Sequence, residues 1–279
     1  AETPVRIGFT YGASEHSLNT FGIFAKEGSK MTVIMDMAAE ADGASGADHT
    51  ALSGVQTKLI LEKDAEVTLV QIIRNDNAKT VLNDIGAKVA DGAKFSVIHL
   101  FLSGGHVYNG CKADLVGKKS TFTADIAYTV GNDAVLDMNY VALHEGKKSV
   151  SEIKTDGVLH ENSKKLFRGT IDFKKGSSGS TGDELETVLM LGDDVENKTI
   201  PLILCAEEDV AGNHGATIGE LDEETLFYFE SRGIKKEVAE DICARASIEK
   251  LLREVEDPKI KELALAELDQ MSAGVKEEA

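Results

Sequence analysis

The chain has 279 residues, of which 42% are apolar and 5% aromatic, and it contains no tryptophan. Its formal net charge of −18 at neutral pH repels phosphate backbones and anionic lipids, which argues against binding to nucleic acid or to a membrane. Three widely spaced cysteines form no disulfide framework, and neither a signal-peptide pattern nor a transmembrane run is visible, so we expect a cytoplasmic protein.

Short segments with alternating apolar and polar residues dominate the chain from about residue 5 to residue 220. Alternation with a period of two sends successive side chains to opposite faces, and it therefore predicts β-strands. The clearest segments span residues 67–73, 95–101, 122–130, 136–142 and 185–191.

A degenerate repeat precedes several of these segments: a polar turn, a small residue, and then an apolar–polar–apolar run. The small residues are Ser29, Ala65, Ala93 and Ala134, spaced by 36, 28 and 41 residues. A recurring turn of this kind predicts a solenoid, whose coils bury their apolar faces by stacking on one another. The irregular spacing fits a β-helix with loops of variable length, and a β-sandwich is the alternative on pattern alone.

The run of Gly and Ser at residues 176–182 has the composition of a flexible surface loop. It interrupts the strands without requiring a domain boundary.

The pattern becomes helical from residue 221 onward. Asp222 is a suitable N-cap for a helix over residues 223–231, and Gly233 is a suitable stop. A second helix is predicted over about residues 235–255, and a third begins at Asp257-Pro258. We therefore predict two domains, a β-helix core at residues 1–220 and a helical C-terminal domain at residues 221–279.

Cys111 is the cysteine with the most suggestive surroundings. Its neighbour Lys112 could lower the pKa of the thiol and make it a nucleophile toward sulfur, whereas the alternative is a small buried core residue. We expect Cys205, at the end of an apolar strand, and Cys243, on a helix, to lie in the core.

His214 stands between Gly212 and Gly215, which leave its imidazole accessible as a ligand for iron or zinc. The alternative is a polar turn before the helix, with the histidine bonded to a backbone carbonyl. No histidine pair has metal-ligand spacing, and no Walker, GxSxG or GxGxxG motif is present, so a metal enzyme or a hydrolase has no positive support.

The stretch from Asp209 through Phe227-Tyr228 to Arg232-Gly233-Ile234 resembles the C-terminal signature of the SufB/SufD family of iron–sulfur cluster assembly scaffolds, and it is more SufD-like. Residues 166–171 and 189–193 carry further parts of this resemblance. The resemblance implies a mainly β chain, a right-handed parallel β-helix followed by a small helical domain, and a scaffold in the SUF system without enzymatic activity of its own.

The same resemblance implies partners and a cargo. Members pair through the β-helix, here with a SufB-like subunit or a second copy, and bind a SufC-type ATPase through their C-terminal helices. A transient iron–sulfur cluster forms at the interface between subunits. The ATPase-docking residues would be Leu226, Phe227, Tyr228, Arg232 and Gly233, although aromatic residues on a terminal helix also serve as core anchors.

Individual positions match the family unevenly. His214 takes the place of the family's interface histidine, a candidate ligand for a cluster or metal. Glu186 and Gly215 stand where SufB-type members have a cysteine and a glutamate, and Gly212 replaces a SufD cysteine. The SufB-type site is therefore incomplete in this chain.

The sulfur-accepting cysteine of SufB-type members aligns near Ala113. Cys111 is two residues earlier and thus on the same strand face, which makes it a possible sulfur relay.

Two other functions remain open on the sequence. A purely structural adaptor would hold the ATPase and a SufB-like subunit together without touching the cluster. A β-helix carbohydrate-active enzyme or acyltransferase is the other, but lyases are usually secreted and hexapeptide acyltransferases need a strict six-residue period that the repeat lacks.

Overall fold

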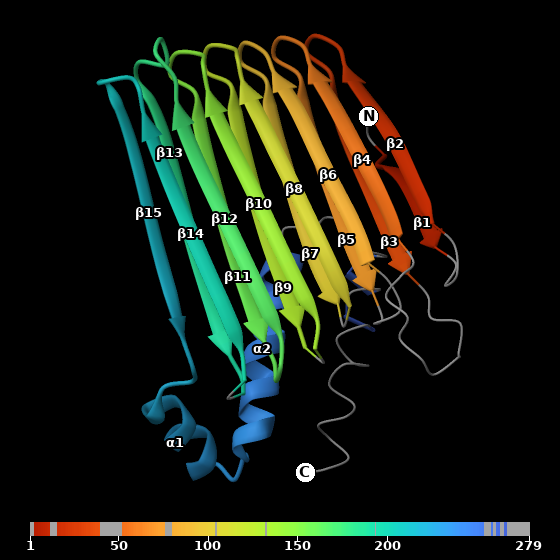
Figure 1. Ribbon diagram of the computed structural model, residues 1–279, viewed down its shortest axis with the longest axis vertical. Coiled ribbons are helices and arrows are strands. Elements are labelled where there is room, and N and C mark those ends of the chain that lie inside the picture. The colour runs from red at the N-terminus through yellow and green to blue at the C-terminus, as the bar shows by residue number, and fades with distance from the viewer. Residues whose placement is uncertain are drawn as a thin grey trace.

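The computed structural model describes residues 3–11, 16–39, 52–75, 80–103, 105–131, 133–192, 194–253, 258, 261–262 and 265–266. Within these residues the chain forms a long run of strands followed by two helices (Figure 1). The strands are β1 (Val5–Tyr11), β2 (Ser17–Ala25), β3 (Lys30–Ala39), β4 (Leu52–Leu61), β5 (Glu66–Asn75), β6 (Thr80–Val89), β7 (Lys94–Ser103), β8 (His106–Leu115), β9 (Thr121–Val130), β10 (Val135–His144), β11 (Val150–Leu159), β12 (Lys164–Phe173), β13 (Ser180–Met190), β14 (Glu196–Cys205) and β15 (Val210–Gly219); the helices are α1 (Glu223–Ser231) and α2 (Lys236–Leu252).

Odd-numbered and even-numbered strands form two separate sheets. One sheet has the order β1-β3-β5-β7-β9-β11-β13-β15 and the other β14-β12-β10-β8-β6-β4-β2. Neighbouring strands such as β5 and β7 are parallel and in register, and the chain alternates between the sheets at every turn. This arrangement is the predicted β-solenoid, and the parallel pairing excludes the antiparallel β-sandwich.

From β5 to β15 the solenoid has a regular period. Strands β5, β7, β9, β11, β13 and β15 begin at residues 66, 94, 121, 150, 180 and 210, so one coil takes 27 to 30 residues. The predicted repeat was irregular for two reasons: Ala134 precedes β10, whereas Ser29, Ala65 and Ala93 precede strands of the other sheet, and the coil from the start of β3 to the start of β5 takes 36 residues. The repeat had therefore combined turns from opposite ends of the coils.

Turns from the even sheet to the odd sheet stack on one another. In each such turn from β2–β3 to β12–β13, a residue with positive φ donates its N–H to the carbonyl of the next coil, as Asp64 does to Asp91 at 2.9 Å. A serine commonly closes the turn from inside, as Ser120 Oγ does by donating to Gly117 O at 2.8 Å. The run at residues 176–182 forms the end of such a turn and the start of β13, with Ser177 and Ser180 fully buried, and the expectation of a surface loop is wrong.

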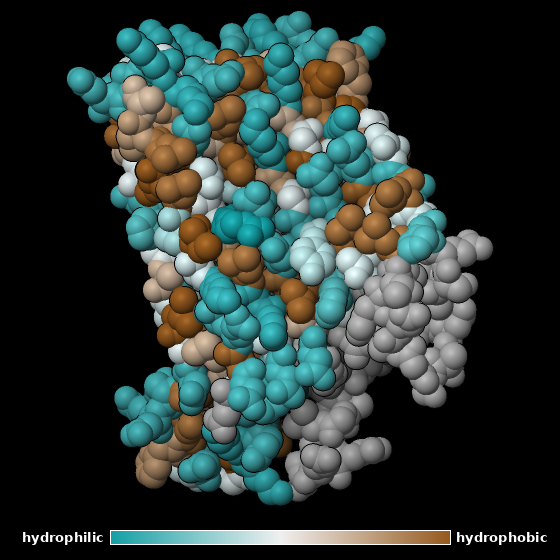
Figure 2. Space-filling view, in the orientation of Figure 1, coloured by the Kyte–Doolittle hydropathy of each residue, from teal (hydrophilic) through white to brown (hydrophobic). Residues whose placement is uncertain are grey.

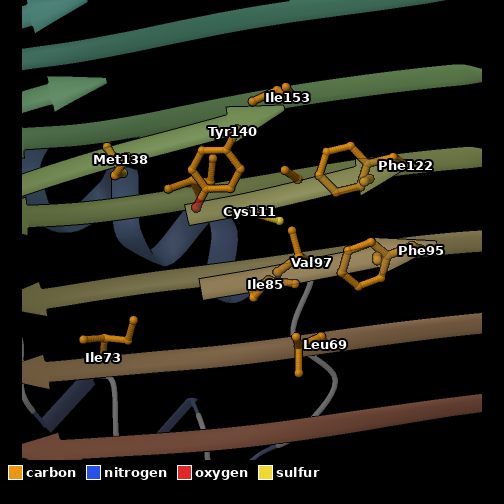
Figure 3. Packing of buried hydrophobic residues seen from close by; sticks show 14 of the residues in the cluster. Leu69, Ile73, Ile85, Phe95, Val97, Cys111, Phe122, Met138, Tyr140 and Ile153 are labelled. Carbon is orange, nitrogen blue, oxygen red and sulfur yellow. The ribbon is translucent and has the colours of Figure 1, made fainter. Parts of the chain in front are cut away.

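The core fills the space between the two sheets. In the strands from β4 to β13, alternate residues point inward and are buried, as predicted from the alternation. Side chains of the same kind stack from coil to coil, for example Phe95 on Phe122 with ring centroids 5.6 Å apart. Figure 3 shows these residues between the ribbons, together with Cys111 and Tyr140.

The two helices follow β15. In α1, the Asp222 carboxylate accepts from Thr225 N at 2.8 Å, and Gly233 ends the helix with φ 78°, as predicted. The second predicted helix is α2, which ends at Leu252. Most of the predicted third helix lies outside the described residues. No described helix combines the length and apolarity needed to cross a membrane.

Helix α2 lies against the outer face of the odd sheet, over β9 and β11 (Figure 1). Ile248, Leu251 and Leu252 are buried there in one cluster with strand residues such as Leu100 and Ala127. Lys250 Nζ adds an ion pair with Asp156 at 2.9 Å. The predicted boundary near residue 220 falls between β15 and α1, and the division into two domains stays a prediction.

Candidate functional site

The last coil of the described solenoid is formed by β14 and β15, which lie at the ends of their sheets. Each has a strand partner on one side only, β12 and β13 respectively. Inward-pointing residues of this coil therefore have no further described coil above them. A strand edge and a set of interior-type side chains are both open to a partner at this end.

His214 lies on β15 in register with Glu184 of β13. Since Glu184 is buried, His214 occupies the face of β15 that belongs to the solenoid interior, and yet it is exposed. The expected accessibility of the imidazole is confirmed. The alternative of a polar turn is wrong, because the histidine is in a regular strand.

One coil deeper lies a buried group of three ionisable side chains. The Lys165 ammonium on β12 forms an ion pair with Glu186 on β13 and donates to Thr199 Oγ1 at 3.2 Å. Glu184, on the same face two residues earlier, is also buried. Gly169 of β12 leaves room for its carboxylate, since a Cβ there would overlap the Glu184 oxygens. We call Lys165, Glu184 and Glu186 the charged triad.

The charged triad is incompletely satisfied. One carboxylate oxygen each of Glu184 and Glu186 has no hydrogen-bond partner within the described structure. Burial and, to a lesser extent, the negative charge of Glu186 together raise the pKa of Glu184 to about 7. Burial also lowers the pKa of Lys165, against which the Glu186 charge acts. At neutral pH, Glu184 is thus poised between its protonated and ionised forms.

A second buried polar group lies in the middle of the solenoid. His99 contacts the Tyr140 hydroxyl through Nδ1 and Gln71 Oε1 through Nε2 at 2.8 Å. Asn83 Nδ2 donates to Gln71 Oε1 at 2.6 Å and to Asn109 Oδ1 at 2.7 Å. Burial lowers the pKa of His99 to about 3, so its imidazole is neutral. We call these residues the central polar network.

Cys111 adjoins this network, since β8 and β10 pair Cys111 with Tyr140. Figure 3 shows its sulfur inside the solenoid, near Ile85 and Val97. The expectation of a lowered thiol pKa is wrong, because burial and the charge of Asp84 raise it. The amino group of Lys112 instead pairs with Asp114 at 2.7 Å.

The other two cysteines differ from the expectation of core positions. Cys205 is exposed at the end of β14, although its register partner Phe173 is fully buried. The difference arises because no described coil stacks on β14. Cys243 on α2 is half-buried, and burial raises the pKa of its thiol.

Helix α1 presents aromatic residues to solvent. Phe227 is 71% exposed and Tyr228 56% exposed, and α1 has no buried residue. The Arg232 guanidinium lies 5.4 Å from the centre of the Tyr228 ring, a cation–π contact. Leu226 is half-buried. Core anchoring is therefore wrong for Phe227 and Tyr228, whose rings form an exposed apolar patch.

His214, Cys111 and Glu186 were recognisable from the sequence, whereas Lys165, Glu184 and the central polar network were not. A signal for them exists, because each is a polar residue in the phase of the alternation that is otherwise apolar. Buried charged residues are rare unless paired, so such positions indicate a functional or specificity role. The side chains with which these residues interact could not be identified from the sequence, because they lie on different strands that only the fold brings together.

The described residues contain no group of three or more His, Cys, Asp or Glu side chains arranged to hold a metal ion. Within the described residues, His214 is not part of such a group.

A family described as "SUF system FeS cluster assembly, SufBD core domain" matches residues 9–247. The iron–sulfur cluster assembly protein SufD of Bacillus subtilis is 25% identical over 242 residues, covering 86% of this chain and 54% of that protein. SufD of Escherichia coli is 27% identical over 186 residues, covering 66% of this chain and 43% of that protein. The chain thus spans about half the length of these relatives.

We expect the stability of the fold to depend on pH through Glu184 of the charged triad. The raised pKa of Glu184 means that the folded chain holds this proton more tightly than the unfolded chain, whose carboxyl has the ordinary value of 4.5. The resulting stability is complete below about pH 4.5 and is lost as the pH rises through about 7. We expect Glu184→Gln to remove this loss and to stabilise the fold by about 3 kcal/mol at about pH 8.

Urea unfolding at about pH 5 and about pH 8 measures the effect. Glu208→Gln, at an exposed glutamate in the turn before β15, is the control and should keep the wild-type pH dependence. An equal pH dependence in wild type and Glu184→Gln would show that Glu184 does not titrate abnormally.

Proposed function

This chain belongs to the SufBD core family of the SUF system for iron–sulfur cluster assembly, and from that membership we propose that it is a SufD-like scaffold subunit. Its working surface is the open last coil, which pairs with a SufB-like subunit or a second copy of this chain. A nascent cluster, the cargo of the assembly, forms across that interface, and the scaffold itself catalyses no reaction.

The observation that carries this proposal is the position of His214. His214 points to the interior side of β15, but it is exposed because β15 is an edge strand. A partner that adds its own strand to β15 would therefore enclose the imidazole. His214 would then supply one ligand to the cluster, and the partner would supply the remaining thiolate or carboxylate ligands. An enclosed, mostly apolar site would protect a cluster from water and oxidants.

A purely structural adaptor is the second candidate function. It is favoured by Glu186, which stands in place of a SufB-type cysteine and is neutralised by Lys165 rather than free to bind iron. In this reading the charged triad helps to shape the end of the solenoid, and all cluster ligands belong to the partner subunit.

Anaerobic reconstitution separates the two candidates. With iron, sulfide and a SufB-like partner, we expect His214→Ala to weaken iron retention by about tenfold and to change the visible absorption of the complex. Asn213→Ala is the matched control, since Asn213 is the adjacent exposed residue and bonds Asp183 at 2.8 Å. Equal iron retention in the two variants would refute ligation by His214 and leave the adaptor function.

The C-terminal helices are proposed to dock a SufC-type ATPase. Phe227 and Tyr228 supply the contact surface, and Arg232 adds a charge held over the Tyr228 ring. Leu226 and Gly233 position this surface, the first by partial burial and the second by ending α1. Exposed aromatic and arginine side chains are the residue types that most often dominate binding energy at interfaces.

Point variants test the docking surface better than deletion of residues 221–279, because deletion would also uncover the sheet face beneath α2. We expect Phe227→Ser with Tyr228→Ser to weaken binding to a SufC-type ATPase by about tenfold or more in calorimetry. Leu18→Ser with Phe24→Ser removes similarly exposed side chains from β2 and should leave binding unchanged. Undiminished binding by the Phe227/Tyr228 variant would disprove the docking role.

Cys111 is proposed to relay sulfur. Its thiolate would attack the terminal sulfur of a desulfurase persulfide, take that sulfur and release the desulfurase thiolate. Because the thiol is buried and its pKa is raised, this transfer requires a state in which the solenoid opens around β8.

Persulfide mapping by mass spectrometry after incubation with a cysteine desulfurase tests the relay. We expect label on Cys111 in the Cys205→Ser variant, where the exposed competing thiol is absent. Label that appears on Cys205 in wild type and is lost in Cys205→Ser, with none on Cys111 in either, would refute it.

A further inference from the structure

Three consecutive turns at one end of the solenoid carry a concentration of positive charge. The turns join β8 to β9, β10 to β11 and β12 to β13, at the end opposite α1 (Figure 1). Figure 2 shows hydrophilic side chains projecting along this end of the molecule. All of the turn lysines are exposed, and we call them the lysine ridge: Lys118, Lys119, Lys147, Lys148, Lys174 and Lys175.

Backbone hydrogen bonds hold the three turns in a row. Lys119 N–H donates to Lys147 O at 2.9 Å, and Lys148 N–H donates to Ser178 O at 3.0 Å. Adjacent coils are separated by about 4.8 Å, so the ridge places lysines at that repeat over roughly 10 Å along the solenoid axis.

One of the six ridge lysines forms an ion pair within the described structure, and the turns stacked on either side bring carboxylates close: Asp91 accepts from Lys118 N–H at 2.7 Å and Asp209 accepts from Ser178 Oγ at 2.8 Å. Lys174 pairs with Asp172 at 2.6 Å, and none of the other five forms an ion pair within the described structure. Glu145 is the one acidic residue of these three turns, in a chain with a net charge of −18. Clustered like charges repel one another, so this arrangement lowers stability.

Two of these lysines also have an unfavourable backbone conformation. Lys119 and Lys148 have φ angles of 58° and 56°, a region that favours Gly, Asn and Asp over other residues. At the equivalent position the stacked turns of other coils have residues suited to it: Gly28, Asp64, Gly92 and Gly179. The fold therefore does not require lysine at these positions, and a role in binding accounts for it.

We propose that the lysine ridge binds an acidic segment of a partner protein, one whose carboxylates repeat at the spacing of the coils. One face of an acidic helix fits, because residues three or four apart lie 5–6 Å from each other along it. The proposal does not depend on cluster assembly at the open last coil.

Other anions fit less well. The turn N–H groups of Gly92, Lys119 and Lys148 already donate to carbonyls of the next coil, so no backbone nest is free to enclose a phosphate ion. A nucleic acid would need a longer basic surface and would be repelled by the acidic remainder of the chain.

Fluorescence anisotropy with the full chain tests the proposal. The probe is a labelled alanine-based helical peptide with glutamates on one face, and a peptide of the same composition with glutamates on all faces is the comparison. We expect Lys118→Gln, Lys147→Gln and Lys175→Gln together to weaken binding of the one-faced peptide about tenfold. The matched control replaces three exposed lysines outside the ridge, Lys26, Lys58 and Lys88, by Gln and should bind as wild type does.

A second variant tests whether the two lysines with positive φ contribute to binding at a cost in stability. Lys119→Gly with Lys148→Gly should raise the thermal unfolding midpoint, because glycine relieves the strained φ, and it should weaken peptide binding. Equal binding by the ridge and control variants, or no binding by wild type, would overturn the proposal. Tighter binding of a DNA duplex than of the one-faced peptide would also overturn it, in favour of a nucleic-acid surface.

Discussion

The stacking of coil on coil is the constraint on which this molecule depends. A single coil cannot bury its inward side chains, so each relies on parallel pairing with the coils before and after it. In the middle of the solenoid, residues such as Phe122 are fully buried, whereas residues in the same phase of the alternation are half-buried or exposed on β14 and β15. The accessibility of His214 and of Cys205 follows from that one difference in position.

The stacking of coils also determines whether buried polar side chains find hydrogen-bond partners. The central polar network is nearly closed on itself, with amide, imidazole and hydroxyl groups from several coils bonded to one another. The charged triad is less complete, since it combines one ammonium with two carboxylates and leaves two oxygens without partners. Unsatisfied buried charge is costly, and it lies directly beneath the open coil, where a partner subunit could change its surroundings.

The outer surface carries three distinct features. Helix α2 covers an apolar area of the odd sheet and fixes the helical segment to the solenoid, while α1 leaves Phe227 and Tyr228 in solvent. The lysine ridge lies at the opposite end of the coils, so a partner bound there would not compete with one bound at α1 (Figure 1).

The sequence by itself determined the strand phase, the solenoid, the caps of α1 and the family, because these depend on local alternation, on turn chemistry and on one contiguous motif. It also identified His214 and Cys111 as residues of interest. Only the tertiary structure decided that Cys111 has a raised thiol pKa, that Cys205 is exposed, and that Lys165 meets Glu186. Those properties depend on which coils lie above and below a strand, and residues about one coil apart in sequence become neighbours only through the register of the parallel sheets.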